Sequence, residues 1–200
     1  GSSEILVNLI DDEKQNHLLR SIEVAGQSQL ALVNDILDMS KIESGKFNID
    51  ENPYDLNHLI TNIKQIFSVH SQDAGLQLKI IQQIKPDFQL IGDKQRIEQV
   101  LINLLGNAIK FTEKGTIVLT ISSHQNRLLF SVQDSGIGIP REVRSQLFQR
   151  FQQADQSISR RFGGSGLGLY VSHSLVGMMQ GSIDVESVEG VGSTFTINLP

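Results

Sequence analysis

The first 46 positions carry apolar residues at the spacing of long helices. Residues 4–10 are predicted to end one amphipathic helix, and a second is predicted from about Asp11 to Gly45. Alternating steps of four and three residues form a heptad seam of Leu18, Ile22, Ala25, Gln29, Leu32, Ile36 and Met39. A second apolar strip adds Leu19, Leu30, Val33 and Leu37. Two strips on one helix favour a helical bundle, and the alternative is one wide face packed on the rest of the chain.

After Gly45 the pattern changes to short alternating segments separated by helices. Strands are predicted at 46–50, 76–81, 116–122, 127–133, 182–187 and 194–199, with a turn at Asn52-Pro53. Asp55 and Asp93 are predicted to cap helices that reach about Ala74 and Lys110. Further helices are predicted from Pro140 and over 166–179. This order predicts an α/β fold in which an open sheet carries helices on one face.

Composition narrows the class of protein. The 200 residues are 39% hydrophobic and 20% charged and include no Cys, which excludes disulfides and thiolate metal sites. No apolar run approaches the ~18 residues of a membrane span, so we expect no membrane segment in these residues. The expected location is cytoplasmic, in a parent protein that a segment outside this sequence could anchor to a membrane. The net charge of −5 argues against nucleic-acid binding. Residues 141–161 nevertheless hold five Arg against two acids, which indicates either an anionic ligand or a solvated surface.

The predicted helix over 93–110 has an unusual polar face. Asn103, Asn107 and Lys110 share that face at spacings of four and three. Asn is a poor helix former, whereas its amide oxygen is a suitable ligand for Mg²⁺ and a nearby Lys suits phosphate. The alternative is a solvated helix face.

Two glycine-rich segments follow. Asp134 ends a predicted strand and begins DSGIGIP, in which Gly136 and Gly138 let the backbone approach a flat ligand and Asp134 can accept from an exocyclic amine such as that of adenine. An ordinary tight turn is the alternative. The segment GGSGLGL, residues 163–169, opens a helix whose free N–H groups suit an anion, and a flexible hinge is the alternative.

In this order the motifs resemble those of sensor histidine kinases, in particular hybrid ones. RIEQVLINLLGNAIKFT resembles the N box, DSGIGIP the G1 box, LFQRFQQ the F box and GGSGLGL the G2 box. GVGSTFTINLP resembles the terminal strand segment, and LVNDILDMSKIESGK the end of the second dimerisation helix. The resemblance covers about Glu4 to Pro200. It implies the Bergerat fold of the GHKL superfamily, a two-layer α/β sandwich of a mixed sheet with helices on one face.

The resemblance also implies cofactors, ATP and Mg²⁺, and roles for single residues. Asn103, Asn107 and Lys110 would be the catalytic set, with Asn107 on Mg²⁺ and the other two beside the phosphates. Asp134 would bind adenine, and residues 152–165 would form a lid over ATP. The remaining binding residues would be Gly136, Gly138 and Ile139 at the base, Phe151 below the lid, Arg161 near the γ-phosphate, and Gly164, Ser165, Gly166, Leu167, Gly168 and Leu169 along the phosphates.

One element of the family is missing. Its phosphoacceptor His is followed by an acid and then by Thr-Pro, and none of the five His has these neighbours: His17, His58, His70, His124 and His173. We therefore expect residues 1–46 to be a truncated dimerisation and phosphoacceptor segment without this H box, and residues 47–200 to be the catalytic ATP-binding domain.

The implied function is the Mg²⁺–ATP-binding region of a histidine kinase. The parent enzyme would transfer the γ-phosphate to a His and then to an Asp of a receiver domain, working as a homodimer through its N-terminal helices, whereas this chain would bind ATP without phosphorylating itself. Alternatives are a degenerate regulatory nucleotide-binding module, a GHKL-type ATPase, which would place an acid where Asn103 stands, and an anti-sigma-type Ser kinase, which the helices before Asp50 disfavour.

Overall fold

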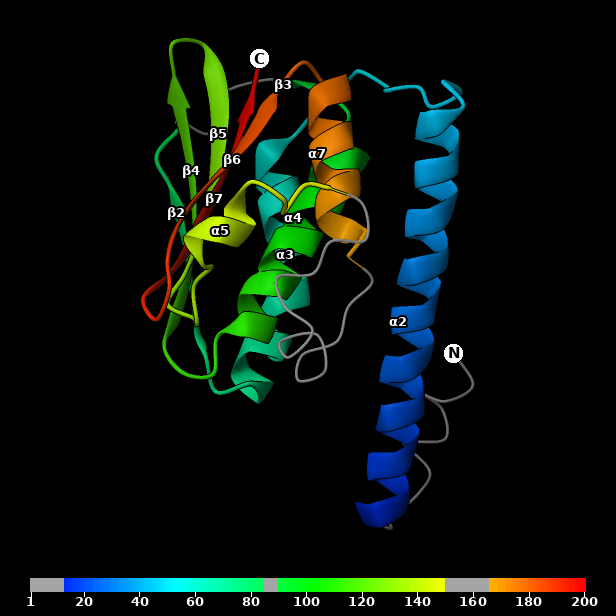
Figure 1. The fold of residues 1–200 in the computed structure, drawn as a ribbon, viewed down its shortest axis with the longest axis vertical. Coiled ribbons are helices and arrows are strands. Elements are labelled where there is room, and N and C mark those ends of the chain that lie inside the picture. Colours follow the sequence, from blue (N-terminus) through cyan, green and yellow to red (C-terminus); the bar gives the residue numbers. More distant parts are fainter. Residues whose placement is uncertain (1–12, 85–89, 150–165) are drawn as a thin grey trace. The chain divides into compact units, whose positions relative to one another are not determined.

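The structure, a computed structural model, describes residues 13–84, 90–149 and 166–200 (Figure 1). The chain divides into two compact units, Gly1–Phe47 and Asn48–Pro200, each with its own internal contacts. No helix within the described ranges is long and apolar enough to cross a membrane. The helix predicted at residues 4–10 and the lid predicted at 152–165 lie outside the described residues.

The first unit is one long helix, α2 (Glu13–Glu43). Gly45 ends it as predicted, with a φ of +64° that glycine adopts without strain. The N–H of Gly45 donates to the carbonyl of Ile42, and the N–H of Lys46 donates to that of Lys41, which together make a Schellman motif. Both predicted strips have exposed members along α2, and these are Ile22, Leu30, Leu32, Val33, Ile36 and Leu37.

The second unit is built on a five-stranded mixed sheet in the order β2-β4-β5-β7-β6. Its strands are β2 (Gln77–Gln82), β4 (Thr116–His124), β5 (Arg127–Asp134), β6 (Ser182–Val188) and β7 (Gly192–Leu199). The β2–β4 pair is parallel, and the other three pairs are antiparallel. Buried and partly exposed side chains alternate along β4, β5 and β7, so one face of the sheet packs on a core.

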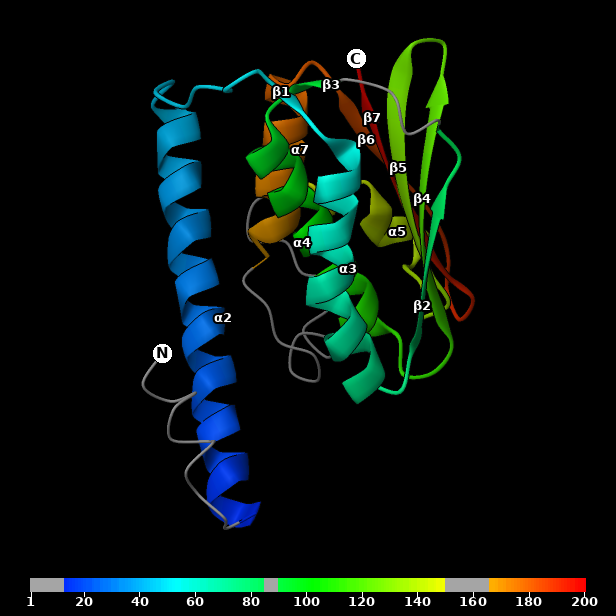
Figure 2. The same cartoon turned by 180° about the vertical axis from the view of Figure 1, so that it is seen from behind.

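Three helices cover that face, as Figures 1 and 2 show from opposite sides. They are α3 (Leu56–Asp73), α4 (Lys94–Phe111) and α7 (Gly168–Met178), and the four-residue α5 (Arg141–Arg144) follows β5. The most deeply buried side chains come from these helices and from the central strands, and they include Leu59, Ile63, Leu101, Leu104, Leu105, Leu175, Ile117, Leu119, Ile121 and Phe130. The predicted two-layer α/β arrangement is confirmed.

Asp93 fixes the start of α4, the helix that carries the predicted polar face. Its Oδ1 accepts from the N–H of Arg96 at 3.1 Å, as the predicted cap requires. Its Oδ2 accepts from the N–H of Asp50 at 3.0 Å, which ties the first residues of the unit to the helix. Asp55 caps α3 in the same way, with Oδ1 2.8 Å from the N–H of Asn57.

Two predictions near residue 50 are wrong. Residues 46–50 form no strand, and Asn52-Pro53 is not a turn but part of a short strand, β1 (Asn52–Tyr54). β1 pairs antiparallel with β3 (Leu90–Gly92), which the sequence pattern did not indicate. Apolar and polar residues alternate at 46–50 as they do in a strand, but a segment becomes a strand only when it forms hydrogen bonds with a partner strand. A three-residue strand is also too short to show a period.

Candidate functional site

The predicted polar face of α4 exists as a connected cluster. Asn103, Asn107 and Lys110 are all half-buried, while Leu104 and Ala108 point into the core. The Nδ2 of Asn107 donates to the Oδ1 of Asn103 at 3.4 Å. This contact turns the oxygen of Asn107 away from Asn103, and no hydrogen bond from the described part of the chain reaches that oxygen. The face therefore presents an amide oxygen and, one turn further, an ammonium group.

Lys110 lies in a partly desolvated position. Burial lowers the pKa of its ammonium group from the ordinary value. Its Nζ is 5.0 Å from the ring centroid of Phe111, so an aromatic face supports the charge. A phosphate placed beside this amine would favour its charged form, because an opposite charge offsets the cost of desolvation.

The start of α7 approaches the Asn face very closely. A Cβ built at Gly168 would lie 2.4 Å from the Oδ1 of Asn103, so any larger residue there would displace the Asn103 amide. Leu167 is 1% exposed and anchors the entry into the helix, while Gly166 has a φ of +68°. The predicted phosphate segment and the predicted metal face thus lie together. Phe151, Arg161, Gly164 and Ser165 lie outside the described residues.

Asp134 ends β5 as a buried carboxylate in which one oxygen accepts hydrogen bonds from the backbone and the other faces a possible ligand. Its Oδ1 accepts from the N–H of Gly136 at 2.8 Å and from the N–H of Ser193 at 3.3 Å. The described residues offer no donor to its Oδ2. Burial raises the pKa of Asp134, and the two backbone hydrogen bonds oppose that rise. The arrangement suits recognition of one neutral donor, such as an exocyclic amine.

Glycines let the segment after Asp134 lie directly against neighbouring backbone. A Cβ at Gly136 would lie 2.3 Å from the carbonyl oxygen of Phe111, at the end of α4. Gly138 has a φ of +66°, and a Cβ there would lie 2.0 Å from the carbonyl oxygen of Val188. At Gly136, Gly138 and Gly168 the absence of a side chain therefore lets the chain pack directly against its neighbours around Asp134 and the Asn face.

Two serines that the motif analysis did not assign hold this segment to the β6–β7 hairpin. The N–H of Ile139 donates to the Oγ of Ser187 at 2.8 Å. Ser187 Oγ also donates to the carbonyl of Gly192 at 2.9 Å and lies 3.0 Å from the Oγ of Ser193. Both serines are buried. Ser193 lies within the segment GVGSTFTINLP and Ser187 shortly before it, which was the available signal, but their pairing depends on the fold.

The polar side chains of this site fit a hard cation that is bound together with a nucleotide better than a metal ion that protein side chains bind alone. Within the described residues, no three His, Cys, Asp or Glu side chains gather to hold a metal ion. The Asn107 oxygen is a neutral, hard ligand of the kind that Mg²⁺ accepts when phosphates and water supply the other ligands. The residues present therefore fit Mg²⁺ carried by a phosphate chain.

Comparison with known proteins agrees with this geometry. The model of the family described as "Histidine kinase-, DNA gyrase B-, and HSP90-like ATPase" matches residues 92–200. Circadian input-output histidine kinase CikA of Synechococcus elongatus is 42% identical over 190 residues, covering 94% of this chain and 25% of that protein. Signal transduction histidine-protein kinase BarA of Escherichia coli K12 is 41% identical over 191 residues, covering 92% of this chain and 21% of that protein. The chain thus spans about a quarter or less of these relatives.

Solved structures show the same fold. Full-length ShkA in complex with AMPPNP superposes with a TM-score of 0.78 at 28% identity, over 100% of this chain and 41% of that one. The catalytic domain of histidine kinase ThkA, free of nucleotide, superposes with a TM-score of 0.65 at 29% identity, over 76% of this chain and 95% of that one. The chain therefore belongs to the family of histidine kinase-, DNA gyrase B- and HSP90-like ATPases, and the relatives named here are histidine kinases.

Proposed function

We propose that residues 47–200 bind Mg²⁺–ATP as the catalytic domain of a sensor histidine kinase. The observation that carries the proposal is the Asp134 carboxylate, whose Oδ1 is held by two backbone N–H groups while its Oδ2 accepts from no described residue. A base with an exocyclic amine fits that oxygen. The ShkA structure in complex with AMPPNP and the family match support the same role.

The phosphates would follow from the base toward α4 and α7. The start of α7, at Gly166 and Gly168, would lie along them, and Lys110 would supply a positive charge. The Oδ1 of Asn107 would hold Mg²⁺, which would neutralise negative charge on the phosphates. The chain's own residues then hold the γ-phosphate in place, and positioning is most of what phosphoryl transfer requires.

A hydrolytic role is disfavoured by the side chain at 103. A general base must take a proton from water, and the neutral amide of Asn103 cannot do so at ordinary pH. Its Nδ2 also donates to the Oγ of Ser172 at 2.8 Å, so the side chain is already committed. We therefore infer transfer to a protein side chain as the parent reaction, in line with the histidine kinase relatives.

We propose that residues 1–46 belong to a dimerisation and phosphoacceptor segment. The exposed apolar strips of α2 suit packing against further helices, in a homodimer of the parent protein. An Asp of a response-regulator receiver domain is the proposed final acceptor, in a protein that works in the cytoplasm. None of the five His of this chain has the neighbours of the family's acceptor.

The proposal is tested by nucleotide selectivity and by labelling. Calorimetry should detect AMPPNP and ADP and find the guanine analogues much weaker, because a guanine presents a carbonyl oxygen where adenine presents its amine. Incubation with γ-labelled ATP should leave the chain without acid-labile label. Equal affinity for guanine nucleotides would contradict the role of Asp134. A label that disappears in His17→Gln would show that this chain does contain an acceptor.

A further inference from the structure

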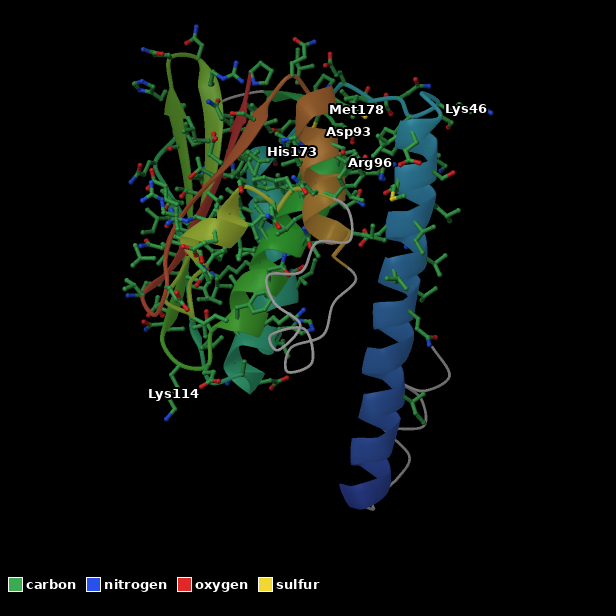
Figure 3. The ribbon with its side chains drawn as sticks, viewed as in Figure 1. Lys46, Asp93, Arg96, Lys114, His173 and Met178 are labelled. Carbon is green, nitrogen blue, oxygen red and sulfur yellow. The ribbon has the colours of Figure 1, made fainter. Side chains whose placement is uncertain are left out.

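A buried hydroxyl on α7 lies against the Asn face of α4. Ser172 is 2% exposed, and its Oγ accepts from the Nδ2 of Asn103 at 2.8 Å. The two helices pack against each other and run in opposite directions, because Met178, at the end of α7, and Asp93, at the start of α4, are labelled at the same end of the pair in Figure 3. This packing places residues 69 positions apart in the chain in contact.

An Asn side chain needs such a partner if it is to bind a cation. Its oxygen and its NH₂ group have nearly the same size, so rotation about the last side-chain bond exchanges a ligand for a donor. Only the oxygen can bind Mg²⁺, and an NH₂ group in the same place would repel it. The affinity for the cation therefore depends on which end of the Asn107 amide faces outward.

Two hydrogen bonds in series accompany that orientation in this structure. Ser172 Oγ accepts from the Nδ2 of Asn103, so the Oδ1 of Asn103 faces the other way. That oxygen accepts from the Nδ2 of Asn107 at 3.4 Å, which leaves the Oδ1 of Asn107 without a donor among the described residues. A Cβ at position 168 would lie 2.4 Å from the Asn103 oxygen, so this orientation depends on glycine at that position.

We propose that Ser172 is a positioning residue for the metal: through Asn103 it holds the Asn107 amide with its oxygen toward the bound cation. This inference rests on the proposed Mg²⁺–ATP function and names a residue that acts one step behind the ligand. Ser172 makes no hydrogen bond to Asp134 or Lys110. Loss of the Ser172 hydroxyl should therefore reduce the gain in nucleotide affinity that Mg²⁺ provides. The affinity contributed by Asp134 at the base and by the Lys110 amine at the phosphates should stay unchanged.

Ser172→Ala tests the inference in the whole chain, with AMPPNP affinity measured by calorimetry in Mg²⁺ and in EDTA. Loss of a neutral hydrogen bond corresponds to about a five-fold change in an equilibrium. The ratio of the two affinities should fall by about five-fold, while the affinity in EDTA stays within about two-fold of wild type. Ser172→Thr keeps the hydroxyl and should retain a ratio nearer the wild-type value. Ser174→Ala, the same change two residues further along α7, should leave the ratio unchanged.

The outcomes separate this inference from the function on which it rests. If the wild-type chain binds no AMPPNP under either condition, the proposed function itself is wrong. If the wild-type chain shows Mg²⁺-dependent binding and Ser172→Ala keeps the same ratio, only the role of Ser172 is wrong. A parallel loss of affinity in Mg²⁺ and in EDTA would show that Ser172 supports helix packing and does not position the ligand. Thermal unfolding checks that each variant is folded. Ser172→Cys, whose thiol is a weaker acceptor, provides a second variant, and its ratio of AMPPNP affinity in Mg²⁺ to that in EDTA should be intermediate.

Discussion

Asp134→Asn isolates the contact between the protein and the nucleotide base. The substitution keeps the size of the side chain and keeps an oxygen to accept from the N–H groups of Gly136 and Ser193. It replaces the outward oxygen, Oδ2, with an NH₂ group. Because the amine of adenine is itself a donor, the variant would present a donor to a donor. The fold should survive, and the removal of a buried charge should stabilise the free chain at neutral pH.

The magnitude follows from the kind of hydrogen bond that is lost. A hydrogen bond to a charged group contributes about 1.5–3 kcal/mol, which is about ten-fold to about a hundred-fold in affinity. Adenine is common to ATP and ADP, so both should weaken by the same factor. The contribution of Mg²⁺ should not change, because Asp134 makes no hydrogen bond to the Asn pair of α4.

Calorimetry with ADP and IDP gives the decisive comparison. IDP carries a carbonyl oxygen in place of the adenine amine, so the wild-type chain should prefer ADP, and Asp134→Asn should lose or reverse that preference because its NH₂ group can donate to the carbonyl. Glu186→Gln removes an exposed acid from β6, which is separated from β5 by β7, and should keep the wild-type preference. If Asp134→Asn bound ADP as tightly as wild type and kept the preference, the assignment of Asp134 to the base would be refuted.

Three further predictions follow from the same region. Gly138→Ala should lower the melting temperature more than Gly190→Ala. Both glycines have a positive φ, but only a Cβ at position 138 would meet backbone, at 2.0 Å from the carbonyl oxygen of Val188. Equal shifts in melting temperature would show that backbone strain alone matters. Ser187→Ala should weaken AMPPNP by the same factor in Mg²⁺ and in EDTA, because its hydroxyl holds the segment at Ile139 and not the Asn pair; a change confined to Mg²⁺ would contradict this. AMPPNP affinity should fall on acidification at a higher pH than an ordinary Asp would give, because burial raises the pKa of Asp134 and the protonated carboxyl accepts poorly. In the free chain, the stability contributed by Asp134 is present when it is protonated and is lost as pH rises through its folded-state pKa. The pH profiles of affinity and of stability should therefore both be flatter in Asp134→Asn.

Local signals in the sequence were sufficient for most of the fold. The caps at Asp55 and Asp93 are formed by side chains that reach only two or three residues along the chain, so their helices could be predicted. The pair β1–β3 was missed because its register joins residues about 40 positions apart and neither strand is long enough to show a period.

The site was predictable in its residue types but not in its connections. Spacing alone brings Asn103 and Asn107 to one face, because both lie on α4. The contact of Asn103 with Ser172 and that of Ile139 with Ser187 join different elements, 69 and 48 positions apart, and depend on how helices and hairpin pack. Those hydrogen bonds decide which atoms face the ligand, and they were visible only in the folded chain.

The most direct test of the account is AMPPNP binding by the wild-type chain and by Asn107→Ala, each measured by calorimetry with Mg²⁺ and with EDTA. The side chain of Asn107 is half-buried and its only hydrogen bond within the described residues is to Asn103, so the variant should fold. The account predicts that the wild-type chain binds AMPPNP more tightly with Mg²⁺ and that Asn107→Ala loses this gain while keeping its affinity in EDTA. Binding that is equally strong with and without Mg²⁺ in both proteins, or no binding by the wild-type chain, would contradict it.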